Sequence, residues 1–464
     1  MMRKKIAIVG SGPGAATVCN NLMQEDAEIT VFEKGDYFQQ KDLEPYSIAE
    51  IDKKYEGGGT TAIFGSSVVN YGAGSCLGGG SEVNAGLYYR TPSEKIRHWG
   101  KYLNGLEKDI FSEDVFQNIE NLLSVQFSKA ETPASSKRFA EGALKMGLVS
   151  EEIPKWVKFK KTDKGIATLR QSMTEVFWKH TLDAIKIKLR AKVTKLEPKL
   201  NGIDITWIEN QNIFTENFDF VFLCGGAIST PYLLMLSRLM KNNYSTRFSY
   251  HPTIKVLAKF PENISDPYLL VPSHQIKLPE KNIGLGVSIV TEKLIKMNMV
   301  GSGFCPDEIY NEHEKFGLYY CMTTSEDGYI CKLPFLREPL PISFKRKGVN
   351  NRLFEGISIL EKILVQAGAI KVRLVGTNED LKQKTNAKIK QVKSAEKMTI
   401  HLMSSCPLGA KISPIDKFGT LKKDSRILIA DSSIIPSVLG VNPQGTVMAL
   451  ANFVSKKFIE RDLL

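Results

Sequence analysis

The sequence is poor in the residues that build metal centres and disulfide frameworks. Its 464 residues include seven cysteines and six histidines. The cysteines stand at positions 19, 76, 224, 305, 321, 331 and 406. They form no CxxC pair, and none lies at a metal-ligand spacing from a histidine. We therefore expect free thiols, a reducing compartment and no bound metal.

Long apolar runs are also missing. The longest, such as 220–223 and 447–454, fall well short of the roughly 20 residues that cross a bilayer. The first nine residues imitate a signal peptide, but the glycines that begin at Gly10 interrupt the apolar run too early. We therefore expect a cytoplasmic protein without a transmembrane segment, for which peripheral membrane contact stays open.

The overall composition is that of a soluble globular protein, with 42% hydrophobic and 24% charged residues. The formal net charge of +12 could attract an acidic substrate, an anionic membrane surface or nucleic acid. No basic motif interleaved with aromatic residues accompanies this charge, so solvated lysine is the favoured interpretation and nucleic-acid binding is not expected. The basic stretch 345–347 could meet an anionic substrate, but solvation is again favoured.

The N-terminal region has the pattern of a strand, a helix and a second strand. Residues 4–9 form a short apolar run, a glycine turn follows, a helical stretch extends to about Met23, and residues 28–32 form another apolar run. Such a βαβ unit implies a parallel sheet with a ligand site at the carboxyl ends of its strands.

Downstream segments alternate between loops and regular elements. Residues 37–86 lack an apolar period and are interpreted as a long functional loop, and residues 91–163 are predicted to be mainly helical. Strands are predicted at 185–196, 203–207, 218–223 and 427–430, and helices at 353–364, capped near Gly368, and at 445–458. Short alternating runs between 253 and 332 predict half-buried antiparallel strands.

The turn after the first strand carries a dinucleotide-binding fingerprint, Gly10-Ser11-Gly12-Pro13-Gly14-Ala15. Gly10 permits the tight turn, Gly12 lets the backbone approach a diphosphate, and Ala15 keeps the helix close to the strand. The helix N-terminus then attracts the negative charge. Glu33 ends the second strand, where its carboxylate can accept hydrogen bonds from both ribose hydroxyls. The pattern predicts an adenine dinucleotide without a 2′-phosphate.

The fingerprint does not distinguish FAD from NAD. A second glycine-rich segment, from Gly72 to Gly86, favours a flavin because bare backbone can press against a flat ring and its phosphates. An NAD-binding alternative is weaker, because it assigns no function to this segment or to residues 431–444.

Four segments in order resemble the glucose-methanol-choline (GMC) oxidoreductases, and the resemblance extends over nearly the whole chain. They are the fingerprint, 78–84, Cys224 to Pro231, and Asp431 to Gln444. The family comprises FAD-dependent alcohol oxidases and dehydrogenases, and the branch that this sequence most resembles includes cholesterol oxidase. The resemblance implies oxidation of a primary or secondary alcohol to a carbonyl by hydride transfer to flavin N5.

The resemblance further implies that His401 is the active-site histidine and Asn442 its partner. Alcohol oxidation needs a group that receives the hydroxyl proton, and the pKa of imidazole suits that role near neutrality. Asn442 can hydrogen-bond the same oxygen and set its direction. His251, in His251-Pro252, matches a family dipeptide and is interpreted as structural.

Other positions are expected, through the resemblance, to bind the cofactor. Asp431 matches a carboxylate near the flavin ribityl and diphosphate, and the main chain at Val193 matches a strand that flanks the adenine. The full set of expected cofactor-binding residues is Gly10, Gly12, Gly14, Ala15, Glu33, Gly79, Gly80, Ser81, Asn84, Val193, Gly226, Asp431 and Asn442.

One departure from the family pattern bears on the cofactor. Some relatives attach FAD through a histidine directly before the asparagine of the glycine-rich segment, but Val83 stands there, so noncovalent FAD is expected. Some relatives also pair two histidines where this chain offers His401 and Asn442, so His401 alone is expected to handle the proton.

The expected architecture is an α/β fold, α+β overall. A Rossmann-like FAD-binding domain with a βαβ N-terminus, residues 1–92, 164–250 and 400–464, is interleaved with a substrate-binding domain, residues 93–163 and 251–399, built on an antiparallel sheet flanked by helices.

The sequence leaves several functions open. A GMC-like lyase or photodecarboxylase and a flavin-binding protein without turnover are the alternatives, and the electron acceptor is oxygen or another molecule. The alcohol stays unnamed because the register of the strands around Tyr319, Tyr320 and Cys321 decides which side chains face the pocket. The oligomeric state also stays open.

Overall fold

A parallel sheet forms the N-terminal part of the fold in the computed structural model, which describes residues 3–127, 132–162, 165–265, 271, 273–344 and 347–463. β1 (Lys4–Val9) and β2 (Ala27–Phe32) pair in parallel and are joined by α1 (Pro13–Leu22). Among the described residues the sheet has five strands in the order β24-β13-β1-β2-β9, all parallel. The predicted βαβ unit is confirmed.

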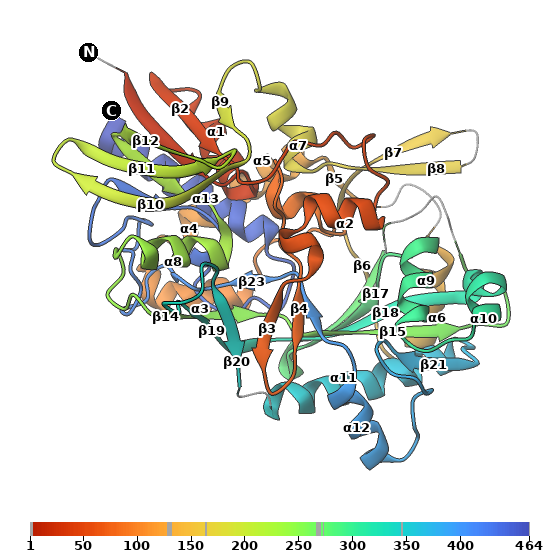
Figure 1. Cartoon of the computed structure of the whole chain (residues 1–464). Coiled ribbons are helices and arrows are strands. Elements are labelled where there is room, and N and C mark those ends of the chain that lie inside the picture. Colours follow the sequence, from red (N-terminus) through yellow and green to blue (C-terminus); the bar gives the residue numbers. More distant parts are fainter. Residues whose placement is uncertain are drawn as a thin grey trace.

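Both faces of this sheet are covered (Figure 1). On one face Phe458 of α13 (Gln444–Phe458) contacts Phe220 and Phe222 of β13 (Phe220–Leu223), with ring centroids 4.8 and 5.1 Å apart. On the other face Phe32 meets Trp207 at 5.1 Å. Trp207 belongs to the antiparallel sheet formed by β10 (Ala191–Lys199), β11 (Gly202–Glu209) and β12 (Asn212–Phe218).

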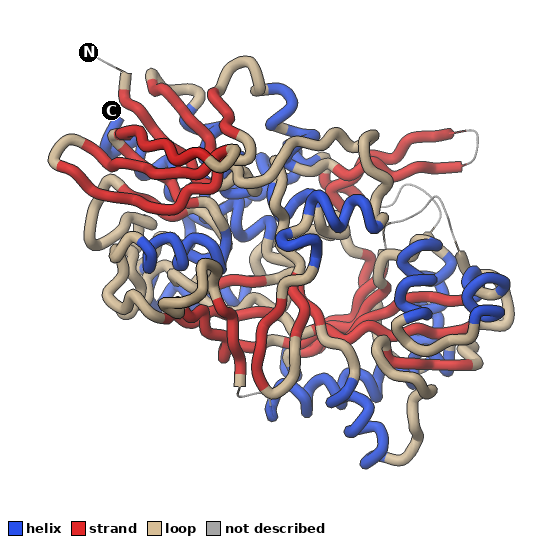
Figure 2. Tube along the Cα trace, viewed as in Figure 1, coloured by secondary structure: helices blue, strands red, loops and turns tan. Residues whose placement is uncertain are grey.

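A larger, mostly antiparallel sheet forms the other half of the molecule, as the strands in Figure 2 show. Among the described residues its path runs through β23 (Leu402–Met403), β14 (Ser245–Tyr250), β19 (Ser325–Cys331), β20 (Leu340–Ser343), β3 (Ala62–Gly65), β4 (Val69–Tyr71), β22 (Met398–Thr399), β15 (Thr253–Lys259), β18 (Phe316–Thr323), β17 (Ile283–Val287), β16 (His274–Leu278) and β6 (Glu151–Glu152). β21 (Lys371–Leu374) also pairs with β15. The expected α/β fold with an antiparallel second sheet is confirmed.

Helices flank the large sheet. Leu353, Ile357 and Leu360 of α11 (Lys347–Gln366) are buried against the apolar face of β17 and β18. At the far end of the other face, α9 (Glu292–Val300) and α10 (Pro306–Asn311) pack on β15 and β18. The remaining α-helices of the described residues are α2 (Ile48–Lys54), α3 (Ser93–Leu103), α4 (Glu107–Ile110), α5 (Glu113–Leu123), α6 (Ala134–Lys145), α7 (Met173–Val176), α8 (Gly226–Leu236) and α12 (Thr385–Ser394).

Several elements follow the sequence prediction closely. Gly368 takes φ +96° two residues after the end of α11, and Ala369 N donates to Leu364 O at 2.9 Å, which is the expected glycine cap. β24 (Ile427–Ile429) and α13 occupy the predicted strand and helix near the C-terminus.

Other elements differ from the prediction. The strand predicted at 185–196 is two strands in different sheets, β9 (Lys186–Lys188) and β10, because Arg190 turns the chain with φ +54°. The predicted strand 218–223 is likewise divided between β12 and β13. Residues 37–86 contain α2, β3 and β4 as well as loops, and residues 91–163 contain β5 (Val125–Gln126), β6 and β7 (Lys155–Thr162) as well as helices.

The division into domains stays a prediction. β3, β4, β14 and β23, all assigned to the FAD-binding domain, hydrogen-bond within the large sheet. β7 and β8 (Gly165–Arg170) pair with each other across the predicted boundary at 163/164.

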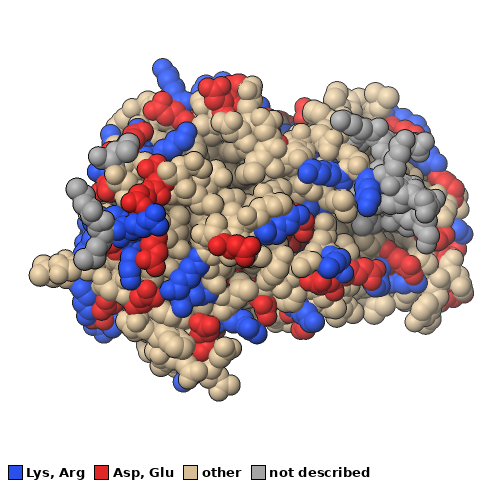
Figure 3. Space-filling view, turned by 90° about the horizontal axis from the view of Figure 1, so that it is seen from above, with Lys and Arg blue, Asp and Glu red and all other residues tan. Residues whose placement is uncertain are grey.

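The surface carries mixed charge on the face seen in Figure 3, where lysine and arginine alternate with aspartate and glutamate. Of the basic stretch 345–347, residues 345 and 346 and the side chain of 347 lie outside the described residues. Within the described part of the chain, no helix has the length and apolarity needed to span a bilayer.

Candidate active site

The fingerprint turn packs against the carboxyl ends of two neighbouring strands. Gly10 takes φ +102°, and a Cβ at this position would lie 2.4 Å from Cys224 O, just after β13. A Cβ on Gly14 would lie 1.9 Å from Ala430 O, just after β24. Both positions therefore require glycine for packing within the protein itself.

Gly12 is different, because a Cβ there would meet nothing within 4 Å. The same holds for Gly80. Between them, Gly79 takes φ +52°, and its Cβ would lie 2.9 Å from Gly12 Cα. The two glycine-rich segments thus meet, and the backbone of Gly12 and Gly80 borders space that the protein does not fill. This arrangement fits a bound diphosphate.

Glu33 lies beside this turn at the end of β2. It is buried, and it accepts hydrogen bonds from Ser11 Oγ at 2.6 Å and from Gly35 N at 2.8 Å. Burial raises its pKa above the ordinary value, and these hydrogen bonds oppose that shift. A carboxylate has about four lone-pair sites, so Glu33 retains acceptor capacity for ribose hydroxyls.

Asp431 lies two residues after β24 and is hydrogen-bonded to the start of α8. Its carboxylate accepts hydrogen bonds from Gly226 N at 2.8 Å, Thr230 Oγ1 at 2.5 Å and Ser433 N at 2.8 Å. Burial raises the pKa of this carboxyl, against the effect of the hydrogen bonds. The predicted cofactor residues Gly226 and Asp431 are therefore in direct contact.

A buried group of charges anchors the second glycine-rich segment. Lys54 Nζ lies 3.2 Å from Glu50 Oε1 and 3.1 Å from Glu82 Oε2. Arg170 Nη2 lies 3.0 Å from the same Glu50 oxygen, and Arg170 Nη1 also donates to Glu82 O. All four side chains are nearly inaccessible to solvent. Two cations thus balance two carboxylates directly behind the segment.

The segment also contacts the C-terminal motif. Asn84 Nδ2 donates to Gln444 Oε1 at 3.1 Å, and Gly86 N donates to Asn84 Oδ1 at 2.9 Å. Ser81, by contrast, is fully buried, donates to Gly78 O at 2.7 Å and accepts from Met173 N at 2.9 Å. Its side chain therefore holds the segment in shape. Val193 lies in β10 at a bulge, paired with Trp207, and its role beside the adenine stays a prediction.

His401 contacts a second histidine, His251. The two Nδ1 atoms are 3.0 Å apart, and the rings are almost perpendicular at 87°. Gly440 N donates to His251 Nε2 at 3.0 Å. Gly440 lies two residues before Asn442, so this hydrogen bond connects the loop that carries Asn442 to the histidine pair. Near the start of the same loop, Trp99 Nε1 donates a hydrogen bond to Ser437 Oγ at 2.9 Å.

Burial keeps both imidazoles neutral at physiological pH. It lowers the pKa of His401 to about 4. The pKa of His251, which is fully buried, falls well below its usual value, first through burial and then through the nearby His401 and Lys95.

The hydrogen bonds assign the tautomers of these neutral rings. Gly440 N–H can only donate, so His251 Nε2 is the bare acceptor and the His251 proton lies on Nδ1. That proton is donated to His401 Nδ1, which leaves the His401 proton on Nε2.

The sequence also matches a family of known enzymes. Residues 51–253 match the N-terminal profile of the GMC oxidoreductases, and residues 344–451 match the C-terminal profile. The chain belongs to the GMC oxidoreductase family. As a GMC oxidoreductase it binds FAD and acts on CH–OH donors.

Relatives of this GMC oxidoreductase cover almost all of the chain. An uncharacterised GMC-type oxidoreductase of Sinorhizobium fredii is 27% identical over 96% of this chain and 92% of its own length. A long-chain-alcohol oxidase of Arabidopsis thaliana is 22% identical over 98% of this chain and 68% of its own length.

Solved structures share the fold. Pyridoxine 4-oxidase from Mesorbium loti superposes with a TM-score of 0.75 at 15% identity, covering 99% of this chain and 100% of its own. Formate oxidase from Aspergillus oryzae RIB40 gives a TM-score of 0.76 at 13% identity, covering 99% of this chain and 98% of its own.

Sequence reasoning missed two parts of this GMC site. The structural interpretation of His251 does not include its contact with His401, for which its position in a family dipeptide is the available signal. The second missed part is the group of buried charges behind the glycine-rich segment. The one local sequence pattern that indicates it is the i,i+4 spacing of Glu50 and Lys54.

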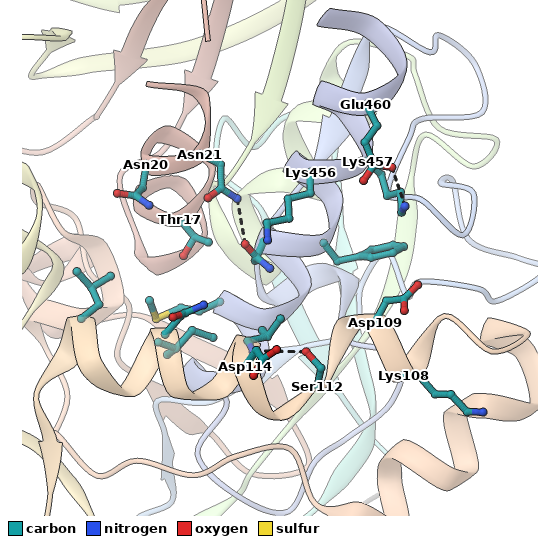
Figure 4. Close-up of a pocket in the computed structure, with 17 residues that line it drawn as sticks. Thr17, Asn20, Asn21, Lys108, Asp109, Ser112, Asp114, Lys456, Lys457 and Glu460 are labelled. Carbon is teal, nitrogen blue, oxygen red and sulfur yellow. Dashed lines mark hydrogen bonds and ion pairs between the residues drawn. The ribbon is translucent and has the colours of Figure 1, made fainter. Parts of the chain in front are cut away.

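A separate surface pocket of about 570 Å³ lies between α1, α4, α5 and α13 (Figure 4). Thr17, Asn21, Asp114 and Lys456 are among its lining residues, and Asn21 points toward Asn452. None of the site residues described above lines this pocket.

Proposed function

We propose that this protein oxidises a primary or secondary alcohol to a carbonyl, with the substrate oxygen bound by His401 and Asn442. The observation that carries the proposal is the neutral, oriented His401, whose Nδ1 is occupied by His251 and whose Nε2 is left for a substrate. The long-chain-alcohol oxidases among its relatives support the alcohol as substrate.

The residues that would hold the cofactor are Gly12, Gly79 and Gly80 at the diphosphate and Glu33 at the ribose. FAD, when bound, supplies the acceptor for the hydride of the alcohol carbon. Val83, in place of a histidine, supports noncovalent attachment.

In the arrangement described, His401 Nε2–H donates a hydrogen bond to the substrate oxygen and orients the hydroxyl. Acceptance of the hydroxyl proton at this atom requires the other tautomer of both rings, with the His251 proton on Nε2. Gly440 N–H would then face an N–H group and must move away. The Gly440 contact therefore controls whether His401 donates to the substrate hydroxyl or accepts from it.

The test is anaerobic mixing of purified flavin-containing protein with sterols, sugars, aliphatic and aryl alcohols, hydroxy acids and choline-like compounds. We expect at least one alcohol to bleach the flavin in the dark, and His401→Ala to slow that step by about 10². Tight FAD binding without bleaching by any compound would point to a flavin-binding protein, and bleaching only under light to photochemistry; either result contradicts the proposal.

A further inference from the structure

The register of the large sheet decides which side chains face the active site. Lys255 of β15 pairs with Tyr320 of β18, Tyr320 with Gly286 of β17, and Gly286 with Gln275 of β16. In the adjacent row Gly284 pairs with Lys277. Paired residues in an antiparallel sheet share a face, so these side chains lie on one side.

The opposite side is the apolar core. Tyr319 and Cys321 are fully buried there, and Tyr319 OH donates to Ser135 O at 3.2 Å. A Cβ on Gly356 of α11 would lie 2.4 Å from Cys321 Sγ. This face is closed by α11 and offers no room for a substrate.

The polar face looks toward the loop that carries Asn442. Tyr89 OH donates to Gln275 Oε1, and Gln275 Nε2 donates to Tyr320 OH at 2.5 Å. A Cβ on Gly445, three residues after Asn442, would lie 2.5 Å from Tyr89 O. At the other end of the face, Thr253 Oγ1 donates to His251 O at 3.1 Å. The polar face thus reaches from the Asn442 loop to the histidine pair.

Three lysines border this face, and burial lowers the pKa of each. They are Lys255, Lys277 and Lys95, the last at the start of α3 and close enough to His251 to depress its pKa. Lys277 Nζ lies 3.8 Å from the centre of the Tyr89 ring and 3.9 Å from Glu151 Oε2. Among the described residues, no carboxylate oxygen lies within 4.0 Å of Lys255 or Lys95 Nζ.

The carboxylates that interact electrostatically with these lysines from a distance lie at the solvent-exposed edge of the polar face. Glu396 acts on Lys255, Glu94 and Glu326 act on Lys95, and Glu151 and Glu94 act on Lys277. All four glutamates are exposed, whereas the lysines are only partly accessible. The carboxylates therefore lie at the exposed edge, whereas the three lysines lie further inside.

We propose that the substrate is an alcohol that also carries an anionic group, a carboxylate or a phosphate, which binds Lys255 while the hydroxyl lies at His401. This inference rests on the proposed alcohol oxidation. An anion here would pair with a lysine that no carboxylate of the described residues approaches within 4.0 Å, whereas an aliphatic chain would cover the same ammonium group without compensation.

The first test compares alcohols that share a carbon skeleton, such as a diol, the hydroxy acid and the phosphate monoester. We expect an anionic member to reduce the flavin with a KM at least tenfold below that of the diol. Lys255→Met should raise the KM of the anionic member at least tenfold relative to the diol, and Lys255→Arg should restore most of the preference. Lys195→Met, at an exposed position on β10, is the matched control and should leave the preference unchanged.

A second test does not depend on turnover. Butyrate and inorganic phosphate are titrated into the flavin-containing protein, and the flavin spectrum and melting temperature are recorded. We expect at least one anion to perturb both in the wild type and neither anion to do so in Lys255→Met.

The outcomes separate the two proposals. Equal KM values for the diol and both anionic alcohols would overturn the anionic substrate but leave alcohol oxidation standing. Lys255-dependent anion binding in a protein that no alcohol reduces would contradict alcohol oxidation and keep the anion site.

Discussion

At the scale of single residues, the site depends on two neutral imidazoles that share one hydrogen bond. His251 accepts from the main chain at Gly440 and donates to His401, so a backbone amide determines which nitrogen of His401 carries the proton. Burial keeps the pair uncharged. In the proposed reaction, His251 would act through His401 and would be a positioning residue.

The lowered pKa of His401 makes a prediction for pH dependence. Its pKa of about 4 lies below the ordinary value, so the neutral form prevails at every pH above it. We expect the rate of anaerobic flavin reduction to stay level from about pH 8 down to about pH 5 and to fall only as the pH approaches 4. Stopped-flow measurements across this range test it; a midpoint near the unperturbed histidine value of about 6.5 would contradict it.

The tautomer of His401 can be measured directly. Nitrogen NMR of ¹⁵N-histidine-labelled protein should show His401 protonated on Nε2 in the wild type, assigned by comparison with His401→Gln. His251→Ala removes the donor to His401 Nδ1, and we expect the NMR spectrum of this variant to show both His401 tautomers. His251→Asn, which can still present an N–H to His401, should restore part of the Nε2-protonated signal. A wild-type His401 protonated on Nδ1 would refute the assignment.

At the scale of elements, the glycines of one motif have different tasks in the turn between β1 and α1. Gly14 touches the end of β24, and Gly10 touches the end of β13, so they bring the helix against the sheet. Gly12 touches no protein atom that would exclude a side chain. The turn therefore separates residues needed for folding from one that is open to a ligand.

A pair of substitutions tests this separation. Gly12→Ala should fold with nearly unchanged stability, because Gly12 has φ −68° and free space, yet bind FAD at least tenfold more weakly. Gly14→Ala should lose about 1–3 kcal/mol or more of folding free energy through overpacking against Ala430. Denaturant unfolding and FAD titration measure the two effects. Equal losses of stability in both variants would contradict the assignment.

The buried charges behind the glycine-rich segment make a second prediction at this scale. Arg170→Met leaves Glu50 and Glu82 with Lys54 as the one close cation among the described residues, and we expect a loss of about 3–5 kcal/mol of folding free energy. Lys179→Met, which removes an ion pair with Glu175 near the surface, is the control and should cost less than about 1 kcal/mol. Denaturant unfolding compares them, and similar losses would refute a structural role for Arg170.

At the scale of the whole molecule, the site lies where the parallel sheet and the large sheet come together. The fingerprint turn follows β1 of the parallel sheet, whereas the second glycine-rich segment follows β4 and His251 lies between β14 and β15, all of the large sheet. The C-terminal segment contacts both regions by hydrogen bonds, Gly440 to His251 and Gln444 to Asn84. A cofactor bound at Gly12 and Gly80 would therefore touch elements of both halves.

Removal of FAD tests this connection. A ligand at about 100 times its Kd stabilises the native state by about 2.7 kcal/mol, so apoprotein should melt several degrees below the flavin-containing protein. Re-addition of FAD should restore the melting temperature in the wild type and fail to do so in Gly12→Ala at the same concentration. Calorimetry or circular dichroism measures this; equal melting temperatures with and without FAD would contradict it.

Much of the cofactor half could be read from the sequence, because its signals are local. The strand, glycine turn and helix of residues 4–22 are contiguous, and their apolar spacing and fixed φ angles depend on near neighbours. The same is true of α11 with its cap at Gly368. The membership of the family likewise follows from short motifs in order.

The chemistry of the pocket required the tertiary structure. His251 and His401 are 150 residues apart and share a hydrogen bond that no local pattern encodes. The register that turns Tyr320 and Lys255 toward the site and Tyr319 toward α11 depends on pairing between distant strands, since a slip of one residue would exchange the two faces. The sequence alone determined the cofactor and the class of enzyme; long-range packing decided the protonation of His401 and which side chains share the polar face of the large sheet.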